Sequence, residues 1–169
     1  MNVGIIMLVH TAFDRAEQVA RQWAAAGCPV VFHVDKNVKN DVYNAFVKSL
    51  SDLQDIRFVK RHRCEWGTWG LVSATQTAAQ RILDDFPKVR HVYLTSGSCV
   101  PLRPVKELFD YLDERPQTDF IESATTADVP WTVGGLDRER FLLRFPFSWR
   151  RQRMLFDIYV KLQRLIGYK

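Results

Sequence analysis

Residues whose side chains can bind or react follow each of the first four strands that the sequence predicts. They are His10 and Thr11, Asp35 and Lys36, residues 61–67 and residues 96–102. In an open parallel α/β sheet, ligands bind outside the carboxyl ends of the strands. We therefore expect these four segments to lie close together and to form one binding site.

Asp35 is the polar residue best placed to contact a nucleotide. An acidic residue at the end of the second strand of an α/β unit can accept hydrogen bonds from a base or a ribose. A turn or a helix cap is the alternative role for an Asp at this position. His33 lies on the same side of the strand, which suggests a metal pair, but no third ligand is evident. We therefore predict a packed or hydrogen-bonded His33 and no metal site.

The segment after the fourth strand consists of small residues. Ser96, Gly97 and Cys99 form a turn in which the backbone can approach a ligand closely. The segment does not read G-x-S-x-G, and a nucleophilic Cys99 would need a histidine base, so a cysteine hydrolase is disfavoured. No G-x-G-x-x-G follows the first strand and no P-loop pattern occurs, which argues against a glycine-rich phosphate loop.

The tryptophans of residues 65–70 and the arginines near the C-terminus each have two possible roles. Tryptophans stand between glycines in residues 65–70, where they could stack on a base or sugar, or belong to the core. Guanidinium groups bind phosphate in bidentate fashion, but a solvated helix face is the favoured role for the clustered arginines. These arginines are Arg138, Arg140, Arg144, Arg150, Arg151 and Arg153.

Alternating apolar strands and amphipathic helices must position these residues. The pattern predicts βαβ units and an α/β fold with a three-layer, mostly parallel sheet. Strands are expected at 3–9, 29–35, 56–60, 91–95 and 119–122, and helices at 14–26, 40–49, 70–86 and 105–114.

The rhythm changes after residue 122. Residues 123–136 resemble a loop, and an amphipathic helix is predicted at 154–166 with no strand after it. We therefore expect an α/β part at 1–136, a basic, partly helical segment at 137–169, and a chain that is truncated relative to a longer protein.

Charge and composition narrow the class of protein. The chain has 169 residues, 47% of them hydrophobic, which excludes a disordered or fibrous polymer. Residues 1–136 carry 15 basic and 16 acidic side chains, and residues 137–169 carry 9 and 3. This distribution disfavours a uniformly basic surface, so no nucleic-acid partner is expected. A peripheral membrane contact through the basic C-terminal segment is the alternative.

The cysteines and the first residues bear on the compartment. Three cysteines are an odd number without metal-ligand spacing, which fits a reducing environment. The first apolar run is too short to span a bilayer and lacks the flanks of a signal peptide. We expect a bacterial-type cytoplasmic protein, with membrane association as an alternative.

Four motifs stand in order along the chain, Leu8-Val9-His10, His33-Val-Asp-Lys36, Trp66-Gly67 and Ser96-Gly-x-x-x-Pro-Leu102. Together they resemble the core-2/I-branching family of glycosyltransferases, which contains β-1,6-N-acetylglucosaminyltransferases and peptide O-xylosyltransferases. The resemblance extends from about residue 3 to residue 122. Residues 134–138 and the arginine-rich stretch resemble the segment that follows in the family.

The resemblance implies a GT-A-like fold and inverting, metal-independent transfer from a UDP-sugar, UDP-N-acetylglucosamine or UDP-xylose, to a glycan or lipid-linked acceptor. The donor is a substrate, so no cofactor is implied. Val9 and Asp35 would hold the uracil, and Trp66 would line the nucleoside pocket. Cys64 falls where the family has another base-contacting residue. His10 and Gly67 belong to the same motifs, and the turn carrying Ser96, Gly97 and Cys99 would lie near the ribose and donor sugar.

Two departures from the family pattern limit the assignment. Many members have Asp where this chain has Cys99. The family's catalytic glutamate and its basic residues on the diphosphate are expected beyond Lys169, and Glu122 is not that base. The leading interpretation is the donor-binding part of a glycosyltransferase, incomplete as given. The alternative is a non-catalytic module that binds a nucleotide or nucleotide-sugar.

Overall fold

The computed structural model describes residues 3–65, 68–121, 123–125 and 139–167. The chain divides into two compact units, unit 1 at residues 1–118 and unit 2 at residues 119–169. The boundary that the sequence predicts, between residues 136 and 137, lies outside the described residues and stays a prediction. None of the helices in the described ranges has the length and apolar composition that crossing a bilayer requires.

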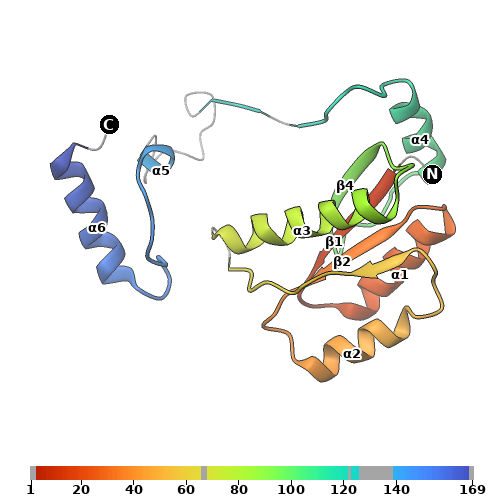
Figure 1. Cartoon of the computed structure of the whole chain (residues 1–169), viewed down its shortest axis with the longest axis horizontal. Coiled ribbons are helices and arrows are strands. Elements are labelled where there is room, and N and C mark those ends of the chain that lie inside the picture. Colours follow the sequence, from red (N-terminus) through yellow and green to blue (C-terminus); the bar gives the residue numbers. More distant parts are fainter. Residues whose placement is uncertain (1–2, 66–67, 122, 126–138, 168–169) are drawn as a thin grey trace. The chain divides into compact units, whose positions relative to one another are not determined.

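Unit 1 is built on a parallel sheet of four strands in the order β3-β2-β1-β4. Helices cover both faces of this sheet, so the predicted three-layer α/β fold is confirmed (Figure 1). The third strand is shorter than predicted, since its regular pairing with β2 ends at Phe58. The strands are β1 (Val3–Val9), β2 (Val30–Val34), β3 (Ile56–Phe58) and β4 (His91–Ser96).

The apolar side chains of the strands alternate between two cores. Ile5, Met7 and Phe32 pack under α1, α2 and α4, whereas Ile6 packs with Ile82 of α3 on the opposite face. Each fully buried side chain of this size contributes roughly 1.5–3 kcal/mol of transfer free energy. The two-sided burial explains the nearly continuous apolar run of β1. The helices are α1 (Phe13–Ala25), α2 (Asn40–Ser49), α3 (Trp69–Asp85) and α4 (Val105–Asp113).

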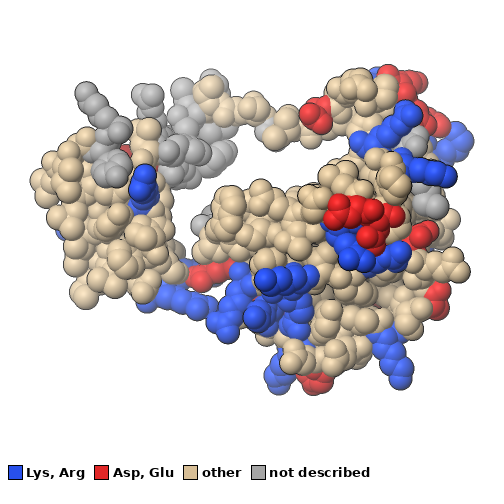
Figure 2. Space-filling view, in the orientation of Figure 1, with Lys and Arg blue, Asp and Glu red and all other residues tan. Residues whose placement is uncertain are grey.

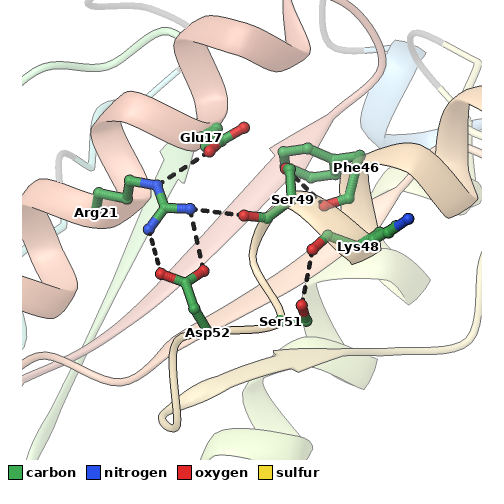
Figure 3. Close-up of polar contacts among 7 residues, drawn as sticks. All are labelled: Glu17, Arg21, Phe46, Lys48, Ser49, Ser51 and Asp52. Atoms are coloured by element: carbon green, nitrogen blue, oxygen red, sulfur yellow. Dashed lines mark hydrogen bonds and ion pairs between the residues drawn. The ribbon is translucent and has the colours of Figure 1, made fainter.

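Arg21 joins α1 to the end of α2 (Figure 3). Its Nε lies 3.0 Å from Glu17 Oε1, and its Nη1 lies 2.7 Å from Asp52 Oδ2. Its Nη2 donates to the Ser49 carbonyl at 2.6 Å. Hydrogen bonds to Asp52 and Glu17 raise the pKa of Arg21. These contacts hold the two helices side by side over β2, the strand that ends next to Asp35.

The segment between β1 and α1 contains a strained residue. Ala12 adopts a left-handed conformation with φ 51° and ψ 49°, which is unfavourable for a residue with a Cβ. We expect Ala12→Gly to raise the free energy of unfolding by about 0.5–1 kcal/mol and Ala12→Val to lower it by more than about 1 kcal/mol. Urea unfolding monitored by circular dichroism measures both changes.

Ala25 provides the matched control because it is exposed and helical. Glycine costs up to about 1 kcal/mol in a helix, so Ala25→Gly should destabilise the protein. If Ala12→Gly destabilised the protein as much as Ala25→Gly does, the inferred strain at Ala12 would be refuted.

Unit 2 contains α5 (Glu139–Leu142) and α6 (Arg153–Ile166), the second close to its predicted range. The buried Gln163 side chain accepts a hydrogen bond from the Arg144 N–H and donates one to the Arg144 carbonyl, both at 2.9 Å. Phe145 stacks on Phe156 with 5.4 Å between ring centroids. Gln163 thus fastens the segment before α6 to the helix itself.

The strand predicted at 119–122 is a correction for the described residues. Residues 119–121 do not form a strand, and Phe120 and Ile121 are exposed. Residue 122 lies outside the described part of the chain. A strand requires backbone pairing with a neighbour, and in the described ranges no strand is paired with residues 119–121. A local apolar pattern was therefore insufficient to predict a strand here.

Candidate functional site

The strand order creates a switch point at the carboxyl end of the sheet. The chain passes from β1 to β2 and β3 on one side, then returns to form β4 on the other side of β1. Connections leaving β1 and β4 therefore diverge, which is the place where α/β sheets bind ligands. His10 follows β1 there and is exposed, and Ser96 ends β4.

Gly97 brings the turn after β4 against the end of β1. Its N–H donates to the Leu8 carbonyl at 3.1 Å. A Cβ at residue 97 would lie 3.0 Å from Val9 Cγ2 and 3.2 Å from Ala16 Cβ, closer than usual packing. The side chain of Val9 is only 3% exposed under this turn. The structure thus places Val9 and Gly97 in direct proximity.

Ser96 and Cys99 close the turn with their side chains. Ser96 Oγ lies 3.2 Å from Cys99 Sγ, and the Ser98 N–H donates to Ser96 Oγ at 3.3 Å. Hydrogen bonds from Ser96 lower the pKa of the exposed Cys99 thiol. The turn therefore offers hydroxyl and thiol groups to solvent beside the switch point.

A groove of about 530 Å³ starts at this turn. Cys99, Leu102, Tyr93 and Tyr111 are among its lining residues. Its apolar and aromatic walls can contact the face of a sugar ring. A group attached to a nucleotide at the switch point therefore has concave surface available next to it.

Asp35 lies at the end of β2, adjacent to the end of β1. Its N–H donates to the Val9 carbonyl at 2.9 Å, and its Oδ1 accepts the Asn37 N–H at 2.7 Å. The residue is 8% exposed, and Oδ2 has no hydrogen bond to the described residues. Asp35 thus stabilises a turn, as the alternative interpretation proposed, and keeps one carboxylate oxygen available to accept a bond from a ligand.

Arg61 braces the turn that carries Asp35. Its Nη2 donates to the Asp35 carbonyl at 3.0 Å and also to the Val38 carbonyl, and its Nη1 donates to Asn40 Oδ1 at 3.0 Å. The guanidinium lies 4.5 Å from the centre of the Tyr43 ring. Sequence reasoning placed Arg61 at a strand end but missed this role, because nothing in the sequence identifies its backbone acceptors.

His33 is buried and hydrogen-bonded, one of the two roles considered from the sequence. It is 1% exposed, and its Nε2 accepts the His62 N–H at 2.8 Å. Burial, reinforced by the neighbouring His62 and Arg61, lowers the pKa of His33 to about 4, although Asp35 acts in the opposite direction. Within the described ranges, no three histidine, cysteine or acidic residues are grouped as metal ligands.

Cys64 lies between the Asp35 turn and the start of α3. Its Sγ is 3.7 Å from the His62 carbonyl oxygen and 3.6 Å from that of Gly70. Burial and the charge of Asp35 raise the pKa of the Cys64 thiol, so these two predicted site residues are electrostatically coupled. Trp66 and Gly67 lie outside the described residues, and their roles stay predictions.

Gly70 makes the close packing of this segment possible. A Cβ at residue 70 would lie 2.1 Å from the Arg63 carbonyl oxygen. The first turn of α3 therefore lies directly against the backbone of residues 63–64. In residues 65–70 the glycine at position 70 therefore has a defined packing role.

Two arginines of the basic segment have contacts of known geometry. The Arg144 backbone is bonded to Gln163, and Arg153 pairs with Asp157 and covers the Trp149 ring. Arg138 and the side chain of Arg140 lie outside the described residues. On the face seen in Figure 2, basic and acidic side chains lie next to one another in several places. A phosphate-binding role for these arginines stays a prediction.

Most of unit 1 matches a known protein family in sequence. The sequence model described as "Branch: Core-2/I-Branching enzyme" matches residues 20–141, well over half of the chain. No curated protein matches the chain. The family match includes Asp35, Cys64 and the turn at residues 96–99, and leaves the end of β1 outside.

Proposed function

The chain belongs to the Core-2/I-branching enzyme family of glycosyltransferases, and we propose that its α/β unit binds the nucleotide of a UDP-sugar donor. The donor is UDP-N-acetylglucosamine or UDP-xylose. Transfer inverts the anomeric carbon, needs no metal ion, and delivers the sugar to a hydroxyl group of a glycan or lipid-linked acceptor.

The Asp35 carboxylate oxygen that has no hydrogen bond to the described residues is the observation that carries this proposal. It lies at the carboxyl end of β2, beside β1 and the switch point. Uracil presents an N–H donor at its pairing edge, and a carboxylate is an acceptor for such a donor. Guanine and adenine also present N–H donors, so their larger ring system is what distinguishes them from uracil. Asp35 therefore supports recognition of a base with an N–H donor, such as uracil, and its charge acts on the Cys64 thiol.

The turn after β4 supports the placement of the rest of the donor. Gly97 allows the backbone to lie against Val9, while Ser96 and Cys99 face solvent. A ribose bound over this turn would extend toward the neighbouring groove with its aromatic walls. The donor would thus cross the switch point from Asp35 toward Cys99.

The proposed chemistry is a single displacement. The acceptor hydroxyl oxygen forms a bond to the anomeric carbon as the bond from that carbon to the UDP oxygen breaks. The hydroxyl proton passes to a general base, and positive groups stabilise the negative charge on the departing UDP. The residues described above serve this reaction by binding and orienting the donor.

Calorimetry with UDP, ADP and GDP tests the proposal. We expect micromolar to millimolar binding of UDP, unchanged by chelator or by Mn²⁺, and weaker binding of ADP and GDP. Asp35→Ala should weaken UDP binding about 10- to 100-fold, since a hydrogen bond to a charged group contributes about 1.5–3 kcal/mol. Asp41→Ala, at an exposed position on α2, is the control and should leave the affinity unchanged.

Equal binding of the three nucleotides, or no binding, would refute the proposal. Incubation with each UDP-sugar and a panel of glycan acceptors then separates enzyme from binding module. Selective UDP binding with no release of UDP from either donor would favour the non-catalytic module.

A further inference from the structure

We propose that His33 is a positioning residue for the nucleotide site, holding the segment at residues 61–64 against the turn that carries Asp35. This inference rests on the proposed function, because the proposed function assigns the nucleotide site to UDP. His33 itself is 1% exposed, so it acts through His62 and does not contact the nucleotide.

The imidazole of His33 accepts a backbone hydrogen bond beyond the point where the pairing of β2 with β3 ends. Regular pairing of β2 with β3 stops at Phe32 and Phe58, and one more bond follows, from the Val59 N–H to the Phe32 carbonyl. Further along the chain, the His62 N–H donates to the His33 side chain. A side chain therefore provides the acceptor that keeps this segment attached to β2.

Residue 62 is fixed on three sides. Its N–H donates to His33 at 2.8 Å, and its carbonyl accepts the Lys36 N–H at 2.9 Å. Its Nε2 lies 3.1 Å from Thr77 Oγ1 on α3. Because Thr77 donates its hydroxyl proton to the Ser73 carbonyl, the hydrogen-bond pattern assigns the proton of this contact to His62 Nε2. His62 therefore links β2 to α3.

Only one form of His33 can hold this contact. Nε2 accepts a hydrogen bond only when the ring is neutral and the proton is on Nδ1. The charged or titratable groups that act on the ring are His62, Arg61 and Asp35. Burial, His62 and Arg61 favour the neutral ring, and they outweigh Asp35. The imidazole is thus kept as an acceptor at neutral pH.

The contacts made through residue 62 converge on Asp35. Lys36 is the next residue in the chain, and Arg61, which precedes His62, donates to the Asp35 carbonyl. Cys64 contacts the His62 carbonyl with its thiol. Loss of the His33 acceptor would release the His62 N–H and loosen the segment that orients both Asp35 and Cys64. The nucleotide would then have to order these residues on binding, which lowers its affinity.

Two substitutions and one matched control test this role. His33→Leu removes the acceptor, whereas His33→Gln keeps a side-chain oxygen able to accept the His62 N–H. Phe46→Leu perturbs the core on the opposite face of the sheet, where Phe46 packs on Phe32. We expect His33→Leu to weaken UDP binding about tenfold and His33→Gln to restore it to within about threefold of the original chain. Phe46→Leu should leave it within about twofold despite lower stability.

Amide hydrogen exchange measures the positioning without any nucleotide. In His33→Leu, the amides of His62 and Lys36 should exchange at least tenfold faster than in the original chain, relative to those of β1. His33→Gln should restore their protection. Exchange that is unchanged in a folded His33→Leu protein would overturn the inference, as would equal losses of UDP affinity in His33→Leu and Phe46→Leu.

The two proposals fail in different ways. If the original chain binds no UDP, the proposed function fails, and the exchange of the His62 and Lys36 amides still decides whether His33 holds the segment. If UDP binds selectively and His33→Leu binds it equally well, only the positioning role is lost.

Discussion

Replacing Gly70 by alanine is expected to lower the free energy of unfolding by about 3 kcal/mol or more and to abolish detectable UDP binding. The new Cβ would lie 2.1 Å from the Arg63 carbonyl oxygen, a backbone atom that cannot rotate away. Either α3 or residues 63–64 must shift, and Cys64 moves with them. Urea unfolding and calorimetry with UDP measure the two losses.

Gly167→Ala is the control for this substitution. Gly167 has a φ of +64° with open space around its Cβ position, so alanine there introduces backbone strain without a clash. Its cost should be about 1–2 kcal/mol, with UDP binding retained. A Gly70→Ala protein as stable as the Gly167→Ala protein would show that α3 can move away from residue 63, contrary to our interpretation.

His33 alone should lower the free energy of unfolding by about 2 kcal/mol when the pH is decreased from 7.5 to 5. In the folded chain, the pKa of His33 is about 4, below its ordinary value of 6.5. The unfolded chain therefore binds a proton near pH 6.5, whereas the folded chain resists protonation down to about pH 4. The contribution is complete above pH 6.5 and is lost progressively as the pH decreases toward 4.

His33→Gln isolates this contribution, since glutamine does not titrate. Urea unfolding of both proteins at a series of pH values gives the difference in stability as a function of pH. The difference in free energy of unfolding between the two proteins should be about 2 kcal/mol smaller at pH 5 than at pH 7.5. A constant difference from pH 7.5 to pH 5 would show that His33 is not held neutral in the folded chain.

The sequence predicted most of unit 1 because burial is encoded in its local periodicity. The strand at residues 3–9 was recognised from apolar residues that fill two cores, and α2 occurs at its predicted range of 40–49. The strand at 119–122 was wrong for its described residues. Its apolar residues resemble those of other strands, but pairing depends on a neighbour that local sequence does not specify.

The place of the candidate site in the fold could be predicted only where it follows from the arrangement of the strands. Asp35 and the turn at residues 96–99 follow from the rule that ligands bind at the carboxyl ends of parallel strands. The link from His33 to His62 was not predictable, since its donor is a backbone N–H that any residue could provide. Arg61 was similarly hidden, because its main acceptors are backbone carbonyls.

The position of β1 between β2 and β4 affects the order in which the strand pairs form during folding. The pairing of β1 with β2 joins residues that are close in the chain, such as Val9 and Val34, whereas its pairing with β4 joins Val3 to His91, which lie much farther apart. Closing the longer loop costs more chain entropy, so this pairing is expected to form late. The switch point lies between these two strands and is therefore completed last. Contacts that form after the transition state act mainly on the rate of unfolding, so a nucleotide bound there would prolong the life of the folded chain more than it would speed its formation.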